Sequence, residues 1–388
     1  MKDKLYIRTF GCQMNDRDSE ALLGLFLDKG YVAVDTPDEA DVILVNTCAV
    51  REHAEGRVMS LLGTFKKLFD TRHPCLPAGR RPDTRRVVGL IGCMARNRGE
   101  EILRKMPHVD LVVGPAHFAK VPEYIATIQS EGLRLINLED GPRSETLYHP
   151  LYRFEQGRAQ VVISTGCDNH CSYCVVPFVR GHLRPRPPQD IIDEVRRNLD
   201  LGITRITLLG QNVNDYDHGG TGFVGLLRSI DAIEGIEELD FMTSHPKNTS
   251  RDLFRFMADS RKIKGHLHLP FQSGSDRILK LMNRGYTRQD YLGLVADYAA
   301  IVAGTVGTDV IVGYPTESEE DFLKTKDILE RVRFRHTYIF KYSPRPHTRA
   351  CASPDDVPKE EKKRRHKILL ELQKKISLSM KITHHKSK

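Results

Sequence analysis

Three cysteines within eight residues are the feature of this sequence that is best suited to chemistry. Residues 165–174 read TGCDNHCSYC, which gives Cys167, Cys171 and Cys174 the spacing Cys-x3-Cys-x2-Cys. Zinc would need a fourth ligand, which no Cys or His supplies at a usual spacing, and His170 is awkwardly placed beside Cys171. A [4Fe–4S] cluster takes one thiolate per iron, so three thiolates leave one iron open. The amino and carboxylate groups of S-adenosylmethionine can bind that iron, and the spacing therefore predicts a radical S-adenosylmethionine site.

Three further cysteines each follow an expected strand by a few residues. They are Cys12, Cys48 and Cys93. In an open parallel sheet the loops at the carboxyl ends of the strands meet at one crevice, so these thiols could hold a second cluster. The alternative is three separate small core residues. Cys75, in a Pro- and Arg-rich insertion at 70–86, and Cys351, in a Pro-rich loop, are expected to be free thiols.

The first half of the chain alternates short apolar runs with helical patterns, as a doubly wound α/β domain does. Strands are expected at 5–9, 42–46, 87–92 and 111–113, and helices at 19–29, 52–69, 99–106 and 118–130.

After a Gly-, Pro- and charge-rich stretch, a second series of strands and helices follows. Six βα units predict a (βα)6 partial TIM barrel, with Cys167 just beyond its first strand, where active sites of barrels lie. Strands are expected at 160–164, 205–209, 239–243, 265–269, 307–312 and 337–342, and helices at 188–200, 225–233, 249–258, 288–302 and 318–332.

A chain of 388 residues is long enough for two domains. We expect a first domain at 1–138, a linker at 139–156, the barrel at 157–358 and a basic helix and tail at 359–388, helical to residue 375 and disordered over the last dozen residues. That tail carries the whole net charge of +8, which suggests a polyanion such as nucleic acid, or simply a solvated helix. No signal peptide or membrane span is expected, and eight cysteines outside a small secreted domain favour a cytoplasmic protein.

The motifs resemble those of radical S-adenosylmethionine methylthiotransferases, and most closely the branch of tRNA-2-methylthio-isopentenyladenosine synthases. The resemblance spans residues 5 to about 375. It rests on GCQMNDRDSE (11–20), NTCAVRE (46–52), GCMA (92–95), TGCDNHCSYCVVPFVRG (165–181), LLGQNVNDY (208–216), FMTSHP (241–246), HLPFQSGSDRILKLMNRGYT (268–287), DVIVGYPTESEEDF (309–322) and YSPRP (342–346).

The resemblance implies a methylthio transfer to carbon 2 of isopentenyladenosine beside the anticodon of tRNA. Two S-adenosylmethionines would serve, one as methyl donor and one as the source of a 5′-deoxyadenosyl radical, with two [4Fe–4S] clusters. Such difficult chemistry belongs to cofactors, while the protein positions them and excludes water. Implied partners are the anticodon stem-loop, a flavodoxin or ferredoxin as electron donor, and a sulfur source. The enzyme would act as a monomer and would not associate with a membrane.

The resemblance also implies which residues bind S-adenosylmethionine. Backbone and amide groups after the second barrel strand would hold the methionyl amine, residues after the fourth strand would hold the ribose, and a glycine after the fifth would let the backbone approach the adenine. These cofactor-binding residues are Gly210, Gln211, Asn212, Gln272, Ser273 with Gly274 and Ser275, Gly313, Tyr173 and Ser244. Turns and helix caps are the competing interpretation of each.

Several positions depart from the family pattern. His347 replaces a usual Gly, 183–185 replace an acidic-then-serine pattern, and the insertion around Cys75 lengthens the first domain. We further expect that the small C-terminal RNA-binding domain of the family (TRAM) is absent, so that tRNA affinity is weak and strongly dependent on salt. Arg180 and Arg186 could contact RNA phosphate or substrate, or could simply be solvated.

Two other functions remain open from sequence. The same chemistry could act on threonylcarbamoyladenosine in tRNA or on a ribosomal protein. Alternatively, the chain could be an iron–sulfur or RNA-binding protein that has lost turnover.

Overall fold

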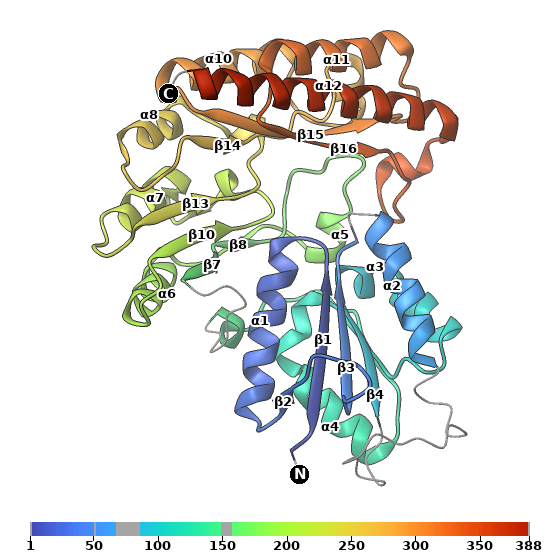
Figure 1. Cartoon of the computed structure of the whole chain (residues 1–388). Coiled ribbons are helices and arrows are strands. Elements are labelled where there is room, and N and C mark those ends of the chain that lie inside the picture. Colours follow the sequence, from blue (N-terminus) through green and yellow to red (C-terminus); the bar gives the residue numbers. More distant parts are fainter. Residues whose placement is uncertain (1, 50–51, 67–85, 149–156, 387–388) are drawn as a thin grey trace. The chain divides into compact units, whose positions relative to one another are not determined.

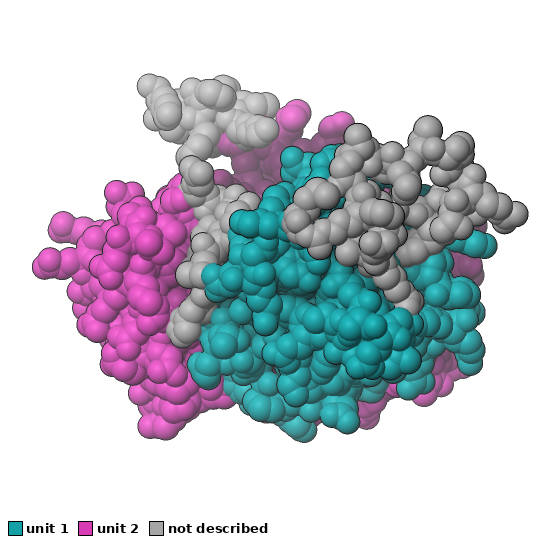
Figure 2. Space-filling model, turned by 90° about the horizontal axis from the view of Figure 1, so that it is seen from below, with its two compact units in different colours: residues 1–156, 175–184 teal, residues 157–174, 185–388 magenta. Residues whose placement is uncertain are grey.

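The computed structural model describes residues 2–49, 52–66, 86–148 and 157–386. The chain divides into two compact units, which Figure 2 colours separately. The first unit consists of Met1–Gln156 together with Val175–Arg184, and the second of Gly157–Cys174 together with Pro185–Lys388. The 70–86 insertion with Cys75 lies outside the described residues, apart from Arg86 at its end.

The first unit is built on a six-stranded parallel sheet with the strand order β2-β1-β3-β4-β5-β6. Figure 1 labels β1, β2, β3 and β4 of this sheet. Its two central strands, β3 and β4, are buried along their whole length, as continuous apolar runs in parallel sheets are. The strands are β1 (Lys4–Phe10), β2 (Val32–Ala33), β3 (Val42–Thr47), β4 (Val87–Gly92), β5 (Leu111–Val113) and β6 (Leu135–Asn137).

Helices cover both faces of this sheet. One face packs against α1 (Gln13–Asp28) and α4 (Val121–Glu131), and the other against α2 (Glu52–Phe65) and α3 (Cys93–Lys105). The short elements η2 (Pro115–Lys120), η3 (Glu145–Tyr148) and α5 (Val176–Arg180) complete the unit. The prediction of a doubly wound parallel-sheet domain is confirmed.

The second unit contains two three-stranded parallel sheets, β13-β10-β7 and β14-β15-β16. All six strands contribute to one apolar core, which the surrounding helices share. The strands are β7 (Arg158–Val162), β10 (Arg205–Leu209), β13 (Glu238–Phe241), β14 (His266–His268), β15 (Thr305–Val312) and β16 (His336–Lys341). This arrangement is the expected (βα)6 partial barrel.

The helices of the second unit are α6 (Pro188–Asp200), α7 (Phe223–Asp231), α8 (Arg251–Asp259), α9 (Asp276–Leu281), α10 (Arg288–Val302), α11 (Glu319–Val332) and α12 (Lys359–Lys386). Capping boxes begin α10 and α11, where Thr287 and Ser318 exchange hydrogen bonds with an aspartate three residues later. The smaller elements are β8 (Ser164–Thr165), β9 (Arg184–Pro185), β11 (Asp217–His218), β12 (Thr221–Gly222), η4 (Val213–Asp215), η5 (Pro246–Asn248) and η6 (Arg349–Ala352).

The C-terminal helix α12 differs from its sequence-based expectation. The helix continues to Lys386, so the prediction of disorder over the last dozen residues is wrong for those that the structure describes. It packs against α11, β15 and β16. Buried side chains recur along it at Lys362, Arg365, Leu369, Gln373 and Ile376, and this helical spacing explains why the element is part of the second unit.

None of the described helices combines the length and apolar character that crossing a lipid bilayer requires.

Candidate functional site: two cysteine triads

The first unit brings Cys12, Cys48 and Cys93 together at the carboxyl ends of adjacent strands. Cys12 precedes α1 after β1, Cys48 follows β3, and Cys93 begins α3 after β4. The hydrogen bond from the Cys48 thiol lowers the pKa of Cys12 to about 6, with the charge of Arg180 acting in the same direction and burial opposing both. The thiols of Cys12 and Cys93 also lie close enough to interact electrostatically.

Two glycines allow these loops to approach each other. Gly11 has φ +128°, and a Cβ there would lie 2.3 Å from Cβ of Cys48. Gly92 has φ +97°, and a Cβ there would lie 2.4 Å from Oδ1 of Asn46. Because an L side chain fits neither position, both glycines are required for the thiols to meet.

Arg180 lies beside this first triad. Its Nε donates to Sγ of Cys93 over 3.1 Å, and its Nη2 donates to Asp18 Oδ2 at 2.8 Å and to Asn15 Oδ1 at 3.1 Å. Burial alone would raise the pKa of Asp18, but Arg180 and Arg143 hold it below its ordinary value. The side chain of Arg180 is only 4% exposed. The expectation that it is solvated or free to contact RNA phosphate is therefore wrong.

Arg186 is also buried, in the second unit. Its Nη1 donates to the carbonyl oxygen of Val162 and to Oε2 of Glu194, both at 2.6 Å. It too is neither solvated nor available to phosphate, and it braces α6 against the end of β7.

The second triad lies on the loop that follows β8, and neighbouring segments hold this loop in place. Ser172 receives a backbone hydrogen bond from Ala350 and donates its own amide to the carbonyl oxygen of Met282. Its hydroxyl lies 2.9 Å from the Tyr314 hydroxyl. Cys167 and Cys171 are buried and interact electrostatically.

Two residues beside this triad were not identified from sequence. Arg284, which is 4% exposed, donates from Nη1 to Sγ of Cys171 and to the Tyr173 hydroxyl, both at 3.3 Å. His245 Nε2 lies 4.0 Å from the same sulfur. Burial, together with Arg284 and Lys247, lowers the pKa of His245 to about 2, so its imidazole is neutral. Both residues lie in the quoted motifs, but only the tertiary fold places them beside a cysteine.

Some buried polar atoms without a protein partner lie at or just after the ends of β7, β10 and β13. The side-chain oxygens of Ser164, Gln211, Asn212 and Ser244 accept no hydrogen bond among the described residues. Buried polar groups are normally paired, with protein, water or a ligand, so these oxygens are available to accept hydrogen bonds from a polar ligand. Three of these residues are among those expected to bind S-adenosylmethionine, and their chemistry fits its amino, carboxylate and hydroxyl groups.

In the segment after β14, in contrast, the serine hydroxyls have protein partners. Ser275 donates its hydroxyl to Asp321 at 2.5 Å, and Gly274 packs so tightly that a Cβ would lie 2.3 Å from the carbonyl oxygen of Lys324. Ser273 is buried and accepts from the amide of Ser275. The backbone of Gln272 pairs with β15. Its φ of +65° is strained for a residue other than glycine, and such strain is often found in ligand sites.

Gly313 follows β15 with φ +71°, and its amide donates to Glu317 at 2.6 Å. A Cβ there would lie 2.3 Å from Cγ of Lys362. In the structure the side chain of Lys362, on α12, therefore fills the space next to Gly313.

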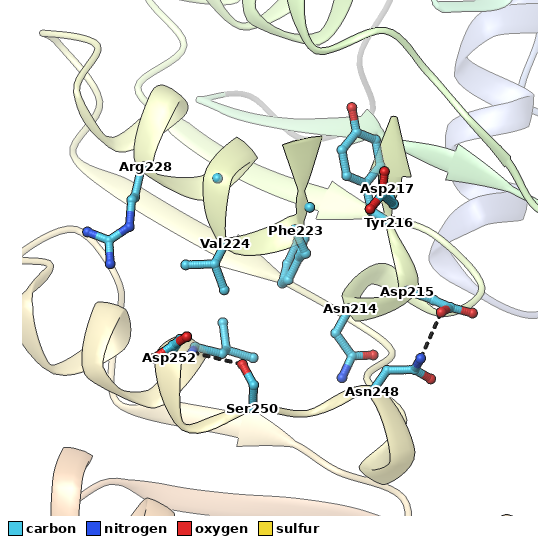
Figure 3. A pocket seen from close by; sticks show the side chains of 13 residues that line it. Asn214, Asp215, Tyr216, Asp217, Phe223, Val224, Arg228, Asn248, Ser250 and Asp252 are labelled. Atoms are coloured by element: carbon cyan, nitrogen blue, oxygen red, sulfur yellow. Dashed lines mark hydrogen bonds between the residues drawn. The ribbon is translucent and has the colours of Figure 1, made fainter. Parts of the chain in front are cut away.

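A cavity of about 480 Å³ lies beside the cysteine loop, between η4, α7 and α8 (Figure 3). None of the expected cofactor-binding residues lines it. Along one edge Asn248 donates to Asp215 at 2.7 Å and accepts from Asn212 at 3.1 Å, and Asn169 donates to Asp215 at 3.3 Å. This amide and carboxylate network links the cysteine loop to the ends of β10 and β13.

The described residues contain no group of three Cys, His, Asp or Glu side chains arranged around a single metal ion. A cubane binds each thiolate through a different iron, so it does not need donors that converge on one point. Three cysteine thiolates in each unit are therefore a suitable set of ligands for a [4Fe–4S] cluster.

Comparisons with known proteins agree with this geometry. Residues 4–114 match the uncharacterized protein family UPF0004, and residues 161–329 match the radical SAM superfamily. The tRNA-2-methylthio-N(6)-dimethylallyladenosine synthase of Acetivibrio thermocellus is 44% identical over 385 residues, covering 97% of this chain and 78% of the relative. That of Syntrophus aciditrophicus is 41% identical over 390 residues, covering 97% and 80%. This chain belongs to that family.

Solved structures support the fold. TsrM from Kitasatospora setae, a radical S-adenosylmethionine methyltransferase, aligns with a TM-score of 0.64 at 14% identity, over 90% of this chain and 75% of that one. The cobalamin-dependent radical enzyme OxsB aligns with a TM-score of 0.59 at 11% identity, over 90% and 54%. Membership of this radical enzyme family means that the chain uses S-adenosylmethionine and [4Fe–4S] clusters.

Proposed function

We propose that this protein transfers a methylthio group to carbon 2 of isopentenyladenosine next to the anticodon of tRNA. The single observation that carries this proposal is the presence of two cysteine triads on two separate sheets, each with a buried arginine donating to one of its sulfurs. Relatives that carry the name of this activity match along almost the whole chain.

We assign Cys167, Cys171 and Cys174 to the cluster that binds S-adenosylmethionine, and Cys12, Cys48 and Cys93 to a second cluster. When bound, these groups would supply the reductive cleavage of the sulfonium carbon–sulfur bond, which gives a radical able to attack an unactivated carbon–hydrogen bond, and a place to hold the sulfur. The chain then has to bind, orient and enclose its substrates.

The unpaired oxygens of Gln211, Asn212 and Ser244 would accept hydrogen bonds from the methionyl amine and the ribose hydroxyls. Gly210 precedes Gln211, and its carbonyl oxygen accepts from the Thr243 hydroxyl at 2.9 Å. Tyr173, Gln272, Ser273 and Gly313 would complete the site, as the family resemblance implies. Burial raises the pKa of Tyr173 well above its usual value, so its hydroxyl remains a hydrogen-bond donor.

The domain division and partners belong to the same proposal. We assign cluster-borne sulfur chemistry to residues 1–138 and radical chemistry to residues 157–358, joined by 139–156, with 359–388 as a basic helix and tail. The enzyme would act as a cytoplasmic monomer that receives electrons from a flavodoxin or ferredoxin and sulfur from a separate source.

Two measurements test the proposal. Anaerobically reconstituted protein should hold about eight irons, falling to about four when Cys12, Cys48 and Cys93 are all replaced by Ala, while Cys351→Ala, at an exposed cysteine, should change nothing. Incubation with S-adenosylmethionine, a reductant and tRNA containing isopentenyladenosine should then yield the methylthiolated nucleoside, detected by mass spectrometry. Cluster-loaded protein that cleaves S-adenosylmethionine but leaves this tRNA unmodified would refute the assigned substrate.

A further inference from the structure

Arg180 makes a set of contacts that the proposed function does not yet explain. It ends α5, and its guanidinium reaches a cysteine sulfur, an amide oxygen and a carboxylate, all within the first unit. Arginine stays charged in proteins, and burying a charge is costly unless its partners are well placed. Because the guanidinium of Arg180 stays charged although it is buried, we expect it to act electrostatically on the three neighbouring thiols.

A second charged pair holds this guanidinium in place. Asp18 is fully buried and accepts from Arg180 with one oxygen and from Arg143 with the other. Asn15, one helical turn before Asp18, accepts from Arg180 and receives a hydrogen bond from the Cys12 thiol at 3.7 Å. With so many fixed partners, the Nε of Arg180 has little freedom to leave the Cys93 sulfur.

Hydrogen bonds and positive charge near cluster sulfurs change the reduction potential of an iron–sulfur cluster, because they favour its more negative, reduced form. We propose that Arg180 is a positioning residue that hydrogen-bonds the Cys93 thiolate and thereby raises the reduction potential of the cluster held by Cys12, Cys48 and Cys93. The inference rests on the proposed function, since it requires that these three cysteines bind the second cluster.

The experiment uses the full chain with Cys167, Cys171 and Cys174 replaced by Ala, so that only the first-unit cluster remains. Its one-electron reduction by a chemical titrant is followed by electron paramagnetic resonance, and iron per chain is counted in parallel. Arg180→Gln removes the charge and the Nε donor, Arg180→Lys keeps the charge alone, and Arg184→Gln is the matched control. Arg184 lies on the same segment but pairs with Asp140 at 3.1 Å.

We expect Arg180→Gln to lower the equilibrium constant for reduction at least tenfold, which corresponds to about 59 mV for one electron. Arg180→Lys should fall between the parent and Arg180→Gln, and Arg184→Gln should match the parent. A structural ion pair would change the unfolding temperature but not the potential.

An unchanged potential in Arg180→Gln would overturn the inference. If that variant cannot retain iron, Arg180→Lys decides: a lowered potential supports the role of Arg180, and a parental one overturns it. A parent that binds no iron at all would instead contradict the proposed function, and the inference with it.

Discussion

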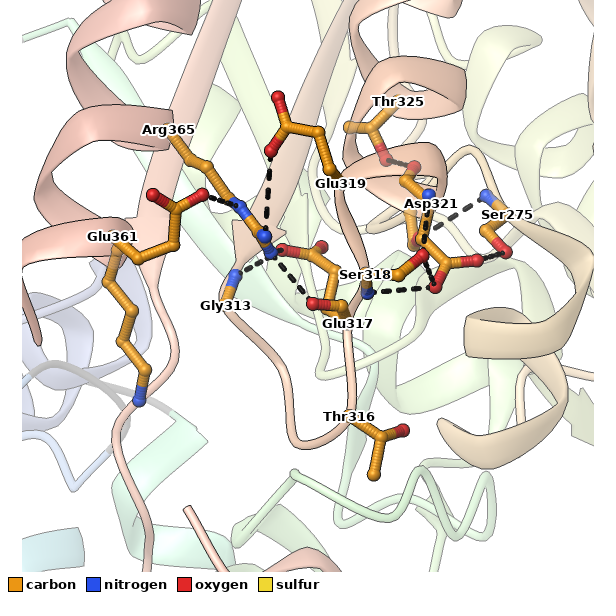
Figure 4. Close-up of polar contacts among 12 residues, drawn as sticks. Ser275, Gly313, Thr316, Glu317, Ser318, Glu319, Asp321, Thr325, Glu361 and Arg365 are labelled. Atoms are coloured by element: carbon orange, nitrogen blue, oxygen red, sulfur yellow. Dashed lines mark hydrogen bonds and ion pairs between the residues drawn. The ribbon is translucent and has the colours of Figure 1, made fainter. Parts of the chain in front are cut away.

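Replacing Arg365 by Gln should strongly destabilise the second unit. Arg365, on α12, donates from Nη1 to Oε2 of Glu317 at 2.7 Å and to its carbonyl oxygen at 2.9 Å, and it pairs with Glu361 at 2.7 Å (Figure 4). The side chains of Arg365 and Glu317 are 5% and 0% exposed. Removing one partner of a buried ion pair leaves the other charge uncompensated, which costs about 3–5 kcal/mol.

The neighbouring Arg364 is the matched control. It pairs with the same Glu361, at 2.7 Å, and with Glu319, but its side chain is 45% exposed. A pair of this kind contributes about 0–1 kcal/mol because water screens it. The two arginines carry the same charge and share Glu361 and Glu319 as partners, but only Arg365 is buried and pairs with the buried Glu317.

Thermal unfolding followed by circular dichroism separates the two cases. For a unit of this size each kcal/mol corresponds to about 2–4 °C, so Arg365→Gln should lower the second unit's transition by about 6–20 °C and Arg364→Gln by less than about 4 °C. Equal shifts for the two variants would refute the reasoning that burial, and not the presence of an ion pair, determines the cost.

Four further predictions follow from particular contacts. Burial, His336 and Arg335 lower the pKa of His266 to about 4. The unfolded state therefore binds the extra proton first, so stability should fall as the pH drops from about 6.5 to about 4, and His266→Gln should flatten that fall in acid unfolding. Gly11→Ala should lose the irons of the first unit, since its Cβ would overlap that of Cys48; a full iron count would contradict this. Ser244→Ala should weaken S-adenosylmethionine binding about 2- to 10-fold in calorimetry without destabilising the apoprotein, because the hydroxyl has no protein partner. Affinity for tRNA should fall steeply between low and high salt in filter binding, and a flat dependence would exclude phosphate contacts as its main source.

The sequence predicted the strands better than the buried polar residues. Continuous apolar runs located the four expected strands of the first sheet, and parallel topology alone was enough to bring the three cysteines of that unit together. Helix α1, in contrast, begins at Gln13, six residues before its expected start. Its first turns contain Asn15, Arg17 and Asp18, which are polar yet fully buried. A pattern of apolar residues cannot identify such a segment as part of a core.

The environments of the arginines could not be predicted for a related reason. The partners of Arg180 lie 87 to 165 residues away in the sequence, and those of Arg284 beside the second triad lie more than 100 residues away. Local sequence gives each arginine a charge but not a partner, and burial of that charge depends wholly on the partner.

Helix α12 has both an exposed basic face and a buried face, and this affects how RNA binding should be studied. Its outward residues, among them Lys363, Lys367 and Lys374, are exposed, while Lys362 and Arg365 face inward and secure the segment that carries Gly313. Trimming this helix to remove its positive surface would therefore also loosen the segment that we propose binds S-adenosylmethionine, and a drop in tRNA modification could not be attributed to lost RNA affinity. Charge reversal confined to the outward lysines separates the two effects, because it leaves the inward face intact.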